Sequence, residues 1–264
     1  MSARTSIEWT DATWNPVRGC SIISKGCTNC YAMRQAHRQS GPGRAYEGLT
    51  QRSKGGPVWT GKVRLVPELL EAPLHWRQPR RIFVNSMSDL FHDDVPFEFV
   101  KQIWDVIAAA PRHTFQILTK RPERLLEFHR WLAGADDIST TEWPRNAWPG
   151  VSVEDQPSAD ERIQTILQIP AAVRWISAEP LLGPIDIARA ARKVVSAYPG
   201  AAHLDWVVAG GESGRGARPP HPDWFRSLRD QCAAAGVPFF FKQWGAWAPC
   251  ETEIEMDHPR LGRT

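Results

Sequence analysis

The sequence predicts an α/β protein that folds as a full or partial (β/α) barrel, with parallel strands and a site at their carboxyl ends. Six short apolar runs alternate with segments of helical periodicity, which is typical of βαβ units in a parallel sheet. Each run ends in polar residues, and the carboxyl ends of parallel strands lie on one face of a barrel. The chain has 264 residues, 42% of them apolar, which is enough for one large core.

The predicted elements follow in chain order. The first strand is expected within SIEWTDATWNPV, and helical periodicity begins after Tyr31. Six further strands are expected within residues 81–89, 114–122, 147–155, 173–180, 205–213 and 238–245. Two of the intervening helices begin near Pro96 and Pro222. Their apolar faces are expected to contain Val100, Ile103 and Ile107 in the first, and Phe225, Leu228 and Cys232 in the second.

We expect a single domain over residues 1–264 with two unusual segments. Residues 40–62 are rich in Gly, Ser and basic residues and lack periodicity, which indicates a long loop or a basic insertion. Residues 248–264 form an acidic tail with four carboxylates between Glu251 and Asp257. The chain has no leading apolar segment and no run of eighteen apolar residues, so we expect a cytoplasmic protein that does not enter a membrane.

The sequence GCSIISKGCTNCYAM, residues 19–33, contains three of the five cysteines as C-x6-C-x2-C, at Cys20, Cys27 and Cys30. Three thiolates can surround a soft metal centre, and a reducing compartment disfavours a disulfide. Because no fourth cysteine is near, the pattern favours a [4Fe–4S] cluster with one iron open to another ligand. The alternatives are a zinc site completed by His37, or three unrelated thiols.

The polar residues that end the six apolar runs are the candidate site residues. They are Asn85, Ser86, Ser88 and Asp89; Thr119, Lys120 and Arg121; Ser152, Glu154 and Asp155; Ser177 and Glu179; Gly210, Gly211, Glu212 and Ser213; and Lys242 and Gln243. The alternative for any single group is that it is only a polar loop followed by a helix N-cap, with no role in a site. Six groups at equivalent positions favour a shared site beside the cysteine loop, which follows the first strand.

Lys120, Glu154 and Glu179 are the candidate catalytic residues. Lys120 offers a cation for a carboxylate or phosphate, and the two glutamates offer acceptors for ribose hydroxyls or an ammonium group. The alternative is that these side chains pair with one another, since buried carboxylates need a partner. The glycine-rich turn that begins at Gly210 presents backbone N–H groups to an anion, or it is only a tight connection.

The order of these motifs resembles a known enzyme group. Three cysteines followed by SDLF, TKRP, GVSVED and SAEP elements are similar to the spore photoproduct lyase branch of radical S-adenosylmethionine (SAM) enzymes. More closely, SDLFH, LTKRP, AEPLLGPI, GGESG and KQWG resemble a phage-associated family of unassigned function, over residues 7–247. Most radical SAM enzymes use C-x3-C-x2-C, so the first interval here is three residues longer.

This resemblance implies a radical SAM type of barrel, a SAM molecule on the open iron, an external electron donor and a 5′-deoxyadenosyl radical. The candidates for binding SAM are Asn85, Ser86, Ser88, Asp89, Ser152 and Glu212. A triplet like Gly210–Glu212 commonly follows an early strand in these enzymes, but here it follows a late one. Lyases of this type need a hydrogen-atom donor, for which Cys250 or a tyrosine is a candidate.

The substrate is suggested by a basic region with interleaved aromatic residues. Ten Lys or Arg stand against three Glu between Arg34 and Arg81. Positive surfaces with aromatic platforms suit nucleic acid, so we expect DNA or RNA to bind through Arg44, Arg52, Lys54 and Trp59. The alternative is a solvated basic face with buried tryptophans. Trp104, Trp131, Trp175 and Trp206 are expected in the core, and Trp244 and Trp247 at the site.

The sequence therefore predicts a radical-SAM-like iron–sulfur enzyme that acts on nucleic acid or a nucleotide, in repair or modification. One alternative is a radical SAM enzyme with a small-molecule substrate. Another is a nucleic-acid-binding protein that is stabilised by a metal or cluster and does not cleave SAM. The oligomeric state is left open.

Overall fold

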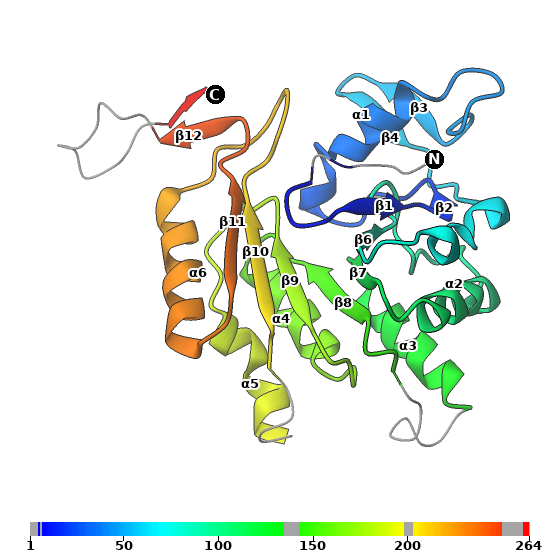
Figure 1. Ribbon diagram of the computed structural model, residues 1–264. Coiled ribbons are helices and arrows are strands. Elements are labelled where there is room, and N and C mark those ends of the chain that lie inside the picture. Colours follow the sequence, from blue (N-terminus) through cyan, green and yellow to red (C-terminus); the bar gives the residue numbers. More distant parts are fainter. Residues whose placement is uncertain (1–4, 6, 135–142, 198–202, 250–260, 264) are drawn as a thin grey trace. The chain divides into compact units, whose positions relative to one another are not determined.

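The computed structural model describes residues 5, 7–134, 143–197, 203–249 and 261–263 (Figure 1). Seven strands have the hydrogen-bonding order β1-β6-β7-β8-β9-β10-β11. Their bounds are β1 (Ala12–Trp14), β6 (Arg81–Val84), β7 (Thr114–Thr119), β8 (Ala147–Ser152), β9 (Trp175–Ala178), β10 (Trp206–Gly210) and β11 (Phe239–Gln243). Each of the seven predicted strand segments contains one of these strands. The predicted α/β class with parallel strands is confirmed.

Helices alternate with these strands. They are α1 (Tyr31–His37), α2 (Phe97–Ala109), α3 (Pro122–Leu132), α4 (Gln156–Ile166), α5 (Ile187–Ala197) and α6 (Pro222–Ala235). The predicted apolar faces of α2 and α6 are buried, Cys232 included. Burial raises the pKa of the Cys232 thiol to about 11, which makes it an unreactive core residue. None of the helices in the described part of the chain is long and apolar enough to cross a membrane.

The described residues form two compact units. Unit 1 lies within residues 1–23, 30–150 and 169–173, and unit 2 within residues 24–29, 151–168 and 174–264. The boundary divides β8, and it also divides the cysteine loop, whose middle part belongs to unit 2. Whether the chain behaves as the single domain predicted from its length stays a prediction.

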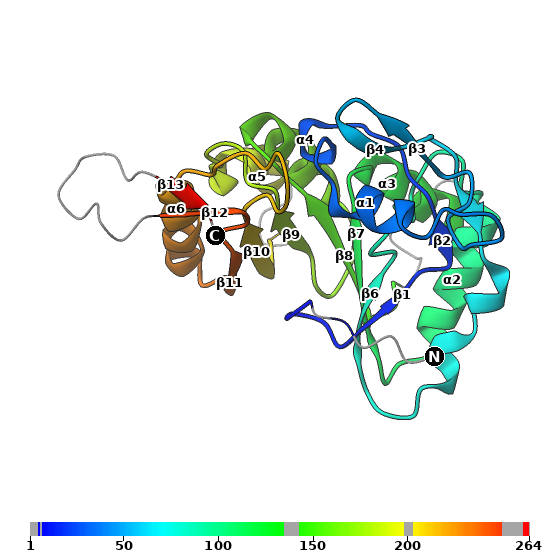
Figure 2. The same ribbon diagram turned by 90° about the horizontal axis from the view of Figure 1, so that it is seen from above.

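Unit 1 contains the parallel strands β1, β6 and β7, in a register that pairs Ala12 with Ile82 and Ile82 with Phe115. Helices α2 and α3 lie beside each other next to these strands (Figures 1 and 2). Trp104 is buried among aromatic rings, as predicted. Trp131 was also expected in the core but is 41% exposed, because it lies at the end of α3 with one face on Phe128.

The basic segment of unit 1 is folded, although its sequence has no periodicity. Strands β3 (Thr50–Ser53) and β4 (Gly56–Trp59) form an antiparallel hairpin beside α1. One face of α1 and the hairpin share a small apolar cluster of Ala32, Met33, Ala36, Tyr46, Leu49, Trp59 and Met87. The short strands β2 (Val17–Arg18) and β5 (Arg64–Leu65) pair with each other in an antiparallel arrangement. The one-turn helices η2 (Pro67–Leu69) and η3 (Ala72–His75) follow β5 in the chain.

Unit 2 contains β9, β10 and β11 in parallel, with α6 alongside β11 in both views (Figures 1 and 2). Trp175 is fully buried, as predicted, and Trp206 stacks on it with ring centroids 5.0 Å apart. Residues 24–29 contribute the one-turn helix η1 (Lys25–Cys27). Strand β12 (Trp247–Pro249) pairs with β13 (Leu261–Arg263), whereas Cys250 and the four tail carboxylates lie outside the described residues.

The core of unit 1 yields a stability prediction. Phe128 is fully buried and contacts the rings of Phe91 and Trp104. Phe128→Ala should lower the free energy of unfolding by about 3–5 kcal/mol, since it removes a ring and leaves a cavity. Urea unfolding checks this, with exposed Glu127→Ala on the same helix as the control, for which little change is expected. Equal effects of the two variants would contradict this packing.

Candidate functional site

The polar residues after β6 hold the backbone that leads into the cysteine loop. The Asn85 side-chain oxygen accepts a hydrogen bond from the Val17 N–H at 3.3 Å, and the Ser88 hydroxyl donates to the Val17 carbonyl at 2.8 Å. Asn85 has a φ of 56°, which is uncommon for a residue other than glycine. Gly19 forms a parallel bridge with Ser88. These contacts fix the chain immediately before Cys20.

Ser86 connects the same strand end to the helix that follows the cysteine loop. Its hydroxyl donates to the Asn15 side-chain oxygen at 3.2 Å, and its carbonyl accepts from the Tyr31 hydroxyl. Tyr31 is the first residue of α1 and comes directly after Cys30. Residues Asn85, Ser86 and Ser88 therefore position the loop on both sides, a role that sequence reasoning did not assign to them.

Asp89 is buried, and its carboxylate accepts four hydrogen bonds from protein groups. One oxygen accepts from the Thr119 hydroxyl at 2.8 Å and the Phe91 N–H at 3.0 Å. The other accepts from the Lys120 N–H at 3.2 Å and the Arg121 guanidinium at 3.1 Å. A carboxylate has about four acceptor sites. The prediction that Asp89 binds SAM is therefore corrected, because its acceptors are already used.

Arg121 carries this network to the cysteine loop. Its guanidinium donates to the Ser21 hydroxyl at 2.6 Å, and the His92 ring nitrogen lies 3.0 Å from the same hydroxyl. Burial alone would lower the pKa of Arg121, but the charges of Asp89 and of the Cys20 thiolate raise it. Arg121 therefore lies in the field of two negative groups, Asp89 and Cys20.

Glu154, at the end of β8, is a buried carboxylate that binds the middle of the cysteine loop. It accepts from the Ser24 hydroxyl at 2.7 Å and from the Arg162 guanidinium at 3.0 Å. Arg162 also donates to the Ser152 carbonyl at 2.7 Å. The side chains of Glu154 and Arg162 are 3% and 7% exposed, so each charge depends on the other. Ser152, a predicted SAM contact, is 6% exposed.

Glu212, which follows β10, binds residues 24–29 of the cysteine loop at Asn29, whereas Glu154 binds them at Ser24. It accepts from the Asn29 amide at 3.0 Å and from the Arg218 Nε at 2.9 Å. Arg218 in turn donates to the Lys25 carbonyl at 2.9 Å, and Asn29 to the Gly216 carbonyl at 2.9 Å. Burial raises the pKa of Glu212, but the hydrogen bonds from Arg218 and Asn29 outweigh it and the pKa is lowered overall.

Glu179, at the end of β9, pairs with the last strand. Lys242 donates to both of its oxygens at 2.8 Å, and the Gln243 amide donates at 3.1 Å. Glu154 and Glu179 each pair with a cation, Arg162 and Lys242 respectively, and these differ from Lys120 and Arg121, the partners that the sequence offered. Lys120, the third candidate catalytic residue, lies half-buried in unit 1.

Cys20, Cys27 and Cys30 are all half-buried. The Cys27 sulfur lies 3.6 Å from the Ser24 hydroxyl. Within the described ranges, no group of three or more His, Cys, Asp or Glu side chains is arranged to hold a metal ion. His37, the alternative zinc ligand, has its Nδ1 3.0 Å from the Thr50 hydroxyl. Three cysteines within eleven residues fit a thiolate-bound centre in donor chemistry.

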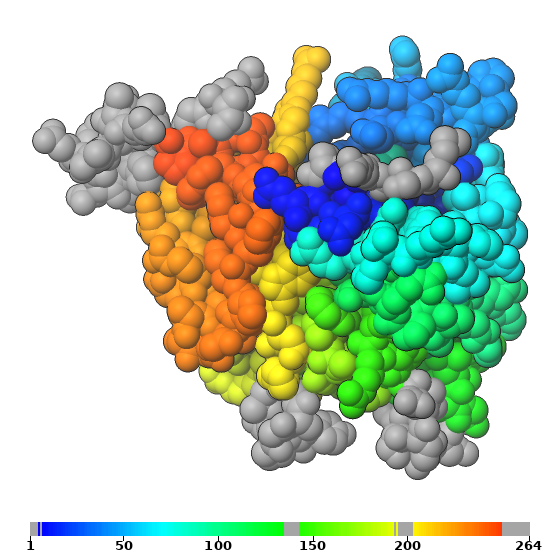
Figure 3. Space-filling view, in the orientation of Figure 1, coloured from blue at the N-terminus to red at the C-terminus, as the bar shows by residue number. Residues whose placement is uncertain are grey.

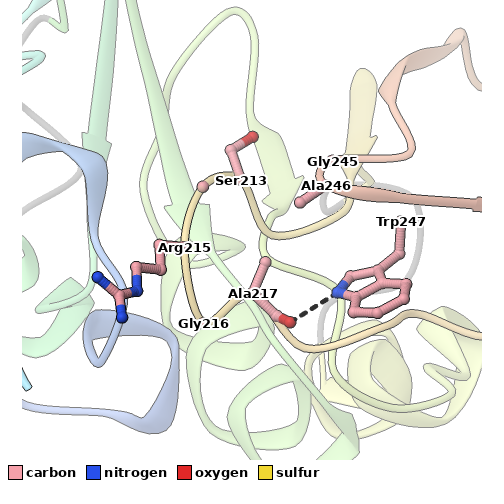
Figure 4. Close-up of a pocket in the computed structure, with 8 residues that line it drawn as sticks. Ser213, Arg215, Gly216, Ala217, Gly245, Ala246 and Trp247 are labelled. Atoms are coloured by element: carbon pink, nitrogen blue, oxygen red, sulfur yellow. Dashed lines mark hydrogen bonds between the residues drawn. The ribbon is translucent and has the colours of Figure 1, made fainter. Parts of the chain in front are cut away.

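Unit 2 also contains an open cavity of about 520 Å³ beside the glycine-rich turn (Figure 4). It is lined by Ser213, Gly214, Arg215, Gly216, Ala217, Gly245, Ala246 and Trp247. The Trp247 indole N–H donates to the Ala217 carbonyl at 2.8 Å, and the Ser213 hydroxyl accepts from Gln243. Trp244 was expected at the site but packs against Phe225 and Phe241 of α6 and β11, with ring centroids about 5 Å apart.

The basic surface of unit 1 is carried by the folded insertion, seen in blue in Figure 3. Arg44, Arg52 and Lys54 are exposed. Trp59, in contrast, is 7% exposed and packs beside Tyr46 in the apolar cluster. Its predicted role in stacking on a base is therefore corrected: the ring is a core residue of the insertion.

Several residues that fix the loop were missed by sequence reasoning. They are Ser21, Ser24, Asn29, His92, Arg162 and Arg218. Each lies outside the predicted strand ends. The only available signal was the longer interval between Cys20 and Cys27, which contains two serines. Ile22 and Ile23 in this interval are 48% and 43% exposed.

Taken together, parallel strands with interleaved helices and a three-cysteine loop after the first strand define the radical SAM type of α/β fold. The chain belongs to a family described as "Protein of unknown function (DUF5131)", which it matches over residues 4–264. No curated protein matches it. The phage association suggested by the sequence motifs stays a prediction.

Two solved structures of spore photoproduct lyase share this fold. A cysteine-to-serine variant has a TM-score of 0.50 at 11% identity, covering 91% of this chain and 79% of that one. A structure described as complexed with dinucleoside spore photoproduct has a TM-score of 0.51 at 10% identity, with the same coverage. At this identity the likeness establishes the fold, and the predicted radical SAM type of fold is confirmed.

The lowered pKa of Glu212 predicts a pH dependence of stability. A lowered folded pKa means that ionised Glu212 stabilises the protein at pH values above 4.5, the ordinary value, and that this contribution is lost as the pH falls through the folded pKa. The difference in unfolding free energy between wild type and Glu212→Gln should therefore shrink below about pH 4.5. Urea unfolding at several pH values, with Glu127→Gln as control, measures this. A difference that stays constant down to about pH 3 would contradict the pairing.

Proposed function

We propose that this protein is a radical-SAM-like iron–sulfur enzyme that acts on nucleic acid, with Cys20, Cys27 and Cys30 as the ligands of a [4Fe–4S] cluster. The observation that carries the proposal is the cysteine loop itself. Three half-buried cysteines follow the first strand, and buried charged networks at the strand ends hold the residues around them. The fold shared with spore photoproduct lyase is consistent with this assignment.

A cluster held by Cys20, Cys27 and Cys30 would supply one-electron chemistry toward a SAM molecule bound beside it. The chain itself would supply three cysteine ligands, and Arg121 holds the residue next to Cys20 through the Ser21 hydroxyl. Lys120 and Glu179 keep the proposed role of contacting substrate or cofactor, since both are only partly buried. Ser86 and Ser88 are retained as proposed SAM contacts, next to their loop-positioning bonds.

Nucleic acid is the proposed substrate class because of the exposed cations on the insertion in unit 1. Phosphate contacts by Lys and Arg supply most of the affinity of such surfaces. A spore photoproduct lyase structure described as complexed with dinucleoside spore photoproduct supports the same class. A SAM-independent role as a cluster-stabilised binding protein is the second candidate, and the exposed cations would serve it equally.

The cluster can be tested by anaerobic reconstitution with iron and sulfide. Wild-type protein should become brown and bind both elements, and Cys27→Ala should abolish this because one of three thiolate ligands is lost. Cys232→Ala is the matched control and should keep the cluster, since that thiol is buried in the core of α6. Colourless protein that carries one tightly bound zinc would refute the cluster.

The formation of 5′-deoxyadenosine distinguishes the two proposed functions, an enzyme and a binding protein. Reduction of the cluster-loaded protein in the presence of SAM should release 5′-deoxyadenosine if the enzyme reading is correct. If protein with a full cluster forms no 5′-deoxyadenosine, the enzyme hypothesis is wrong and the binding-protein hypothesis is favoured.

Nucleic-acid binding should depend steeply on salt, since neutralised phosphates release counterions. Changing Arg44, Arg52 and Lys54 together to Ala should weaken binding of single-stranded DNA or RNA and lower the salt slope by up to about 2. Titrations at several salt concentrations measure both effects. Arg226→Ala with Arg229→Ala, two exposed cations of α6, is the control and should change neither.

No measurable affinity of wild-type protein for any DNA or RNA at low salt would favour a small-molecule substrate instead. A wild-type affinity that the triple variant retains would show that the insertion is not the binding surface.

A further inference from the structure

The first interval of the cysteine motif is three residues longer than is common, and the structure gives these residues a use. Ser24, Lys25 and Gly26 immediately precede Cys27 and belong with it to unit 2. They form a tight turn in which the Cys27 N–H donates to the Ser24 carbonyl at 3.0 Å and the Thr28 N–H to the Lys25 carbonyl at 3.2 Å. The position of Cys27 therefore follows from where this turn is attached.

Each of the three residues contacts either Glu154 or Arg218, the cation that pairs with Glu212. The Ser24 hydroxyl donates to Glu154, and the Lys25 carbonyl accepts from Arg218, which is itself held by Glu212. Gly26 is buried against Glu154, where a Cβ would lie 2.5 Å from the carboxylate. No side chain fits at residue 26 while Glu154 stays in place.

The turn is also attached on the other side of Cys27. Asn29 donates to Glu212 at 3.0 Å and to the Gly216 carbonyl at 2.9 Å. Cys27 thus lies between two attachments, three residues after Ser24 and two before Asn29. The anchoring carboxylates are 3% and 4% exposed and are paired with Arg162 and Arg218, so neither can move without leaving a buried charge unpaired.

We infer that Glu154 and Glu212 are positioning residues of the cysteine loop, and that Ser24–Gly26 is the segment of the longer interval that they bind. Together they place Cys27 before any metal arrives. The inference rests on the proposed function only in taking Cys27 as a ligand, and it gives these two glutamates a different role from the substrate and SAM contacts first predicted for them.

Site-resolved alkylation of the metal-free protein tests this directly. Iodoacetamide rates at Cys20, Cys27 and Cys30 are measured by mass spectrometry, each relative to the same cysteine in urea-unfolded protein. In Ser24→Ala, Glu154→Ala and Glu212→Ala the Cys27 rate should rise about tenfold, since a hydrogen bond to a charged group is lost. The rates at Cys20 and Cys30 should change by less than about twofold, because unit 1 contacts hold the residues beside them.

Two further variants separate positioning from general destabilisation. Glu154→Gln keeps an acceptor for Ser24 and should restore slow alkylation of Cys27 relative to Glu154→Ala. Glu179→Ala removes the third strand-end carboxylate of unit 2, which is bound to Lys242 and Gln243, and should leave the Cys27 rate unchanged. Should a glutamate variant fail to fold, Ser24→Ala decides, because it keeps both ion pairs intact.

The outcomes distinguish this inference from the proposed function. Unchanged Cys27 alkylation in Ser24→Ala and Gly26→Ala overturns the inference even if wild-type protein binds a cluster. Faster alkylation of Cys27 in these variants supports the inference even if reconstituted protein binds no iron. That result would contradict the proposed function but not the positioning of Cys27. Where a cluster forms, Ser24→Ala should also change the electron paramagnetic resonance spectrum of its reduced form, since the hydroxyl lies beside the Cys27 sulfur.

Discussion

A buried carboxylate must find a positive or hydrogen-bonding partner, and at the strand ends of this protein part of that partner is the cysteine loop. Glu154 binds Ser24 while it is paired with Arg162, and Glu212 binds Asn29 while it is paired with Arg218. The parallel strands of unit 2 fix these carboxylates through their backbone. The sheet therefore determines where residues 24–29 lie, without requiring a metal to organise them.

In unit 1, buried polar residues at the strand ends bind the residues beside Cys20 and Cys30. Asp89, buried after β6, orients Arg121, and Arg121 binds Ser21 beside Cys20. Asn85 and Ser88 hold Val17, and Ser86 holds Tyr31 after Cys30. Seven of the strand-end residues thus support the loop, and Lys120 and Glu179 stay proposed contacts for substrate or cofactor. Such supporting contacts are what a reactive centre needs to keep its ligands in place.

The sequence was informative where local patterns decide the structure. Alternating apolar runs and helical faces gave the parallel α/β fold, and the polar run ends located the groups around the loop, because strand direction follows from the chain order. The partners of those groups could not be predicted, since Ser24 and Glu154 are 130 residues apart. Trp59 was misjudged for a related reason: a tryptophan among cations looks exposed, but α1 and the hairpin bury it in a shared cluster. The proposed cluster came from the three-cysteine pattern, whereas the proposed SAM came from the resemblance.

Hydrogen–deuterium exchange of the metal-free protein tests most directly whether strand-end carboxylates fix the loop. The account predicts that the amides of Cys27 and Thr28, which close the turn, exchange at least about tenfold more slowly than those at the exposed hairpin tip, Lys54 and Gly55. This protection should disappear in a Glu154→Ala and Glu212→Ala double variant that still unfolds cooperatively. Wild-type amides at Cys27 and Thr28 that exchange as fast as the hairpin tip would contradict the account.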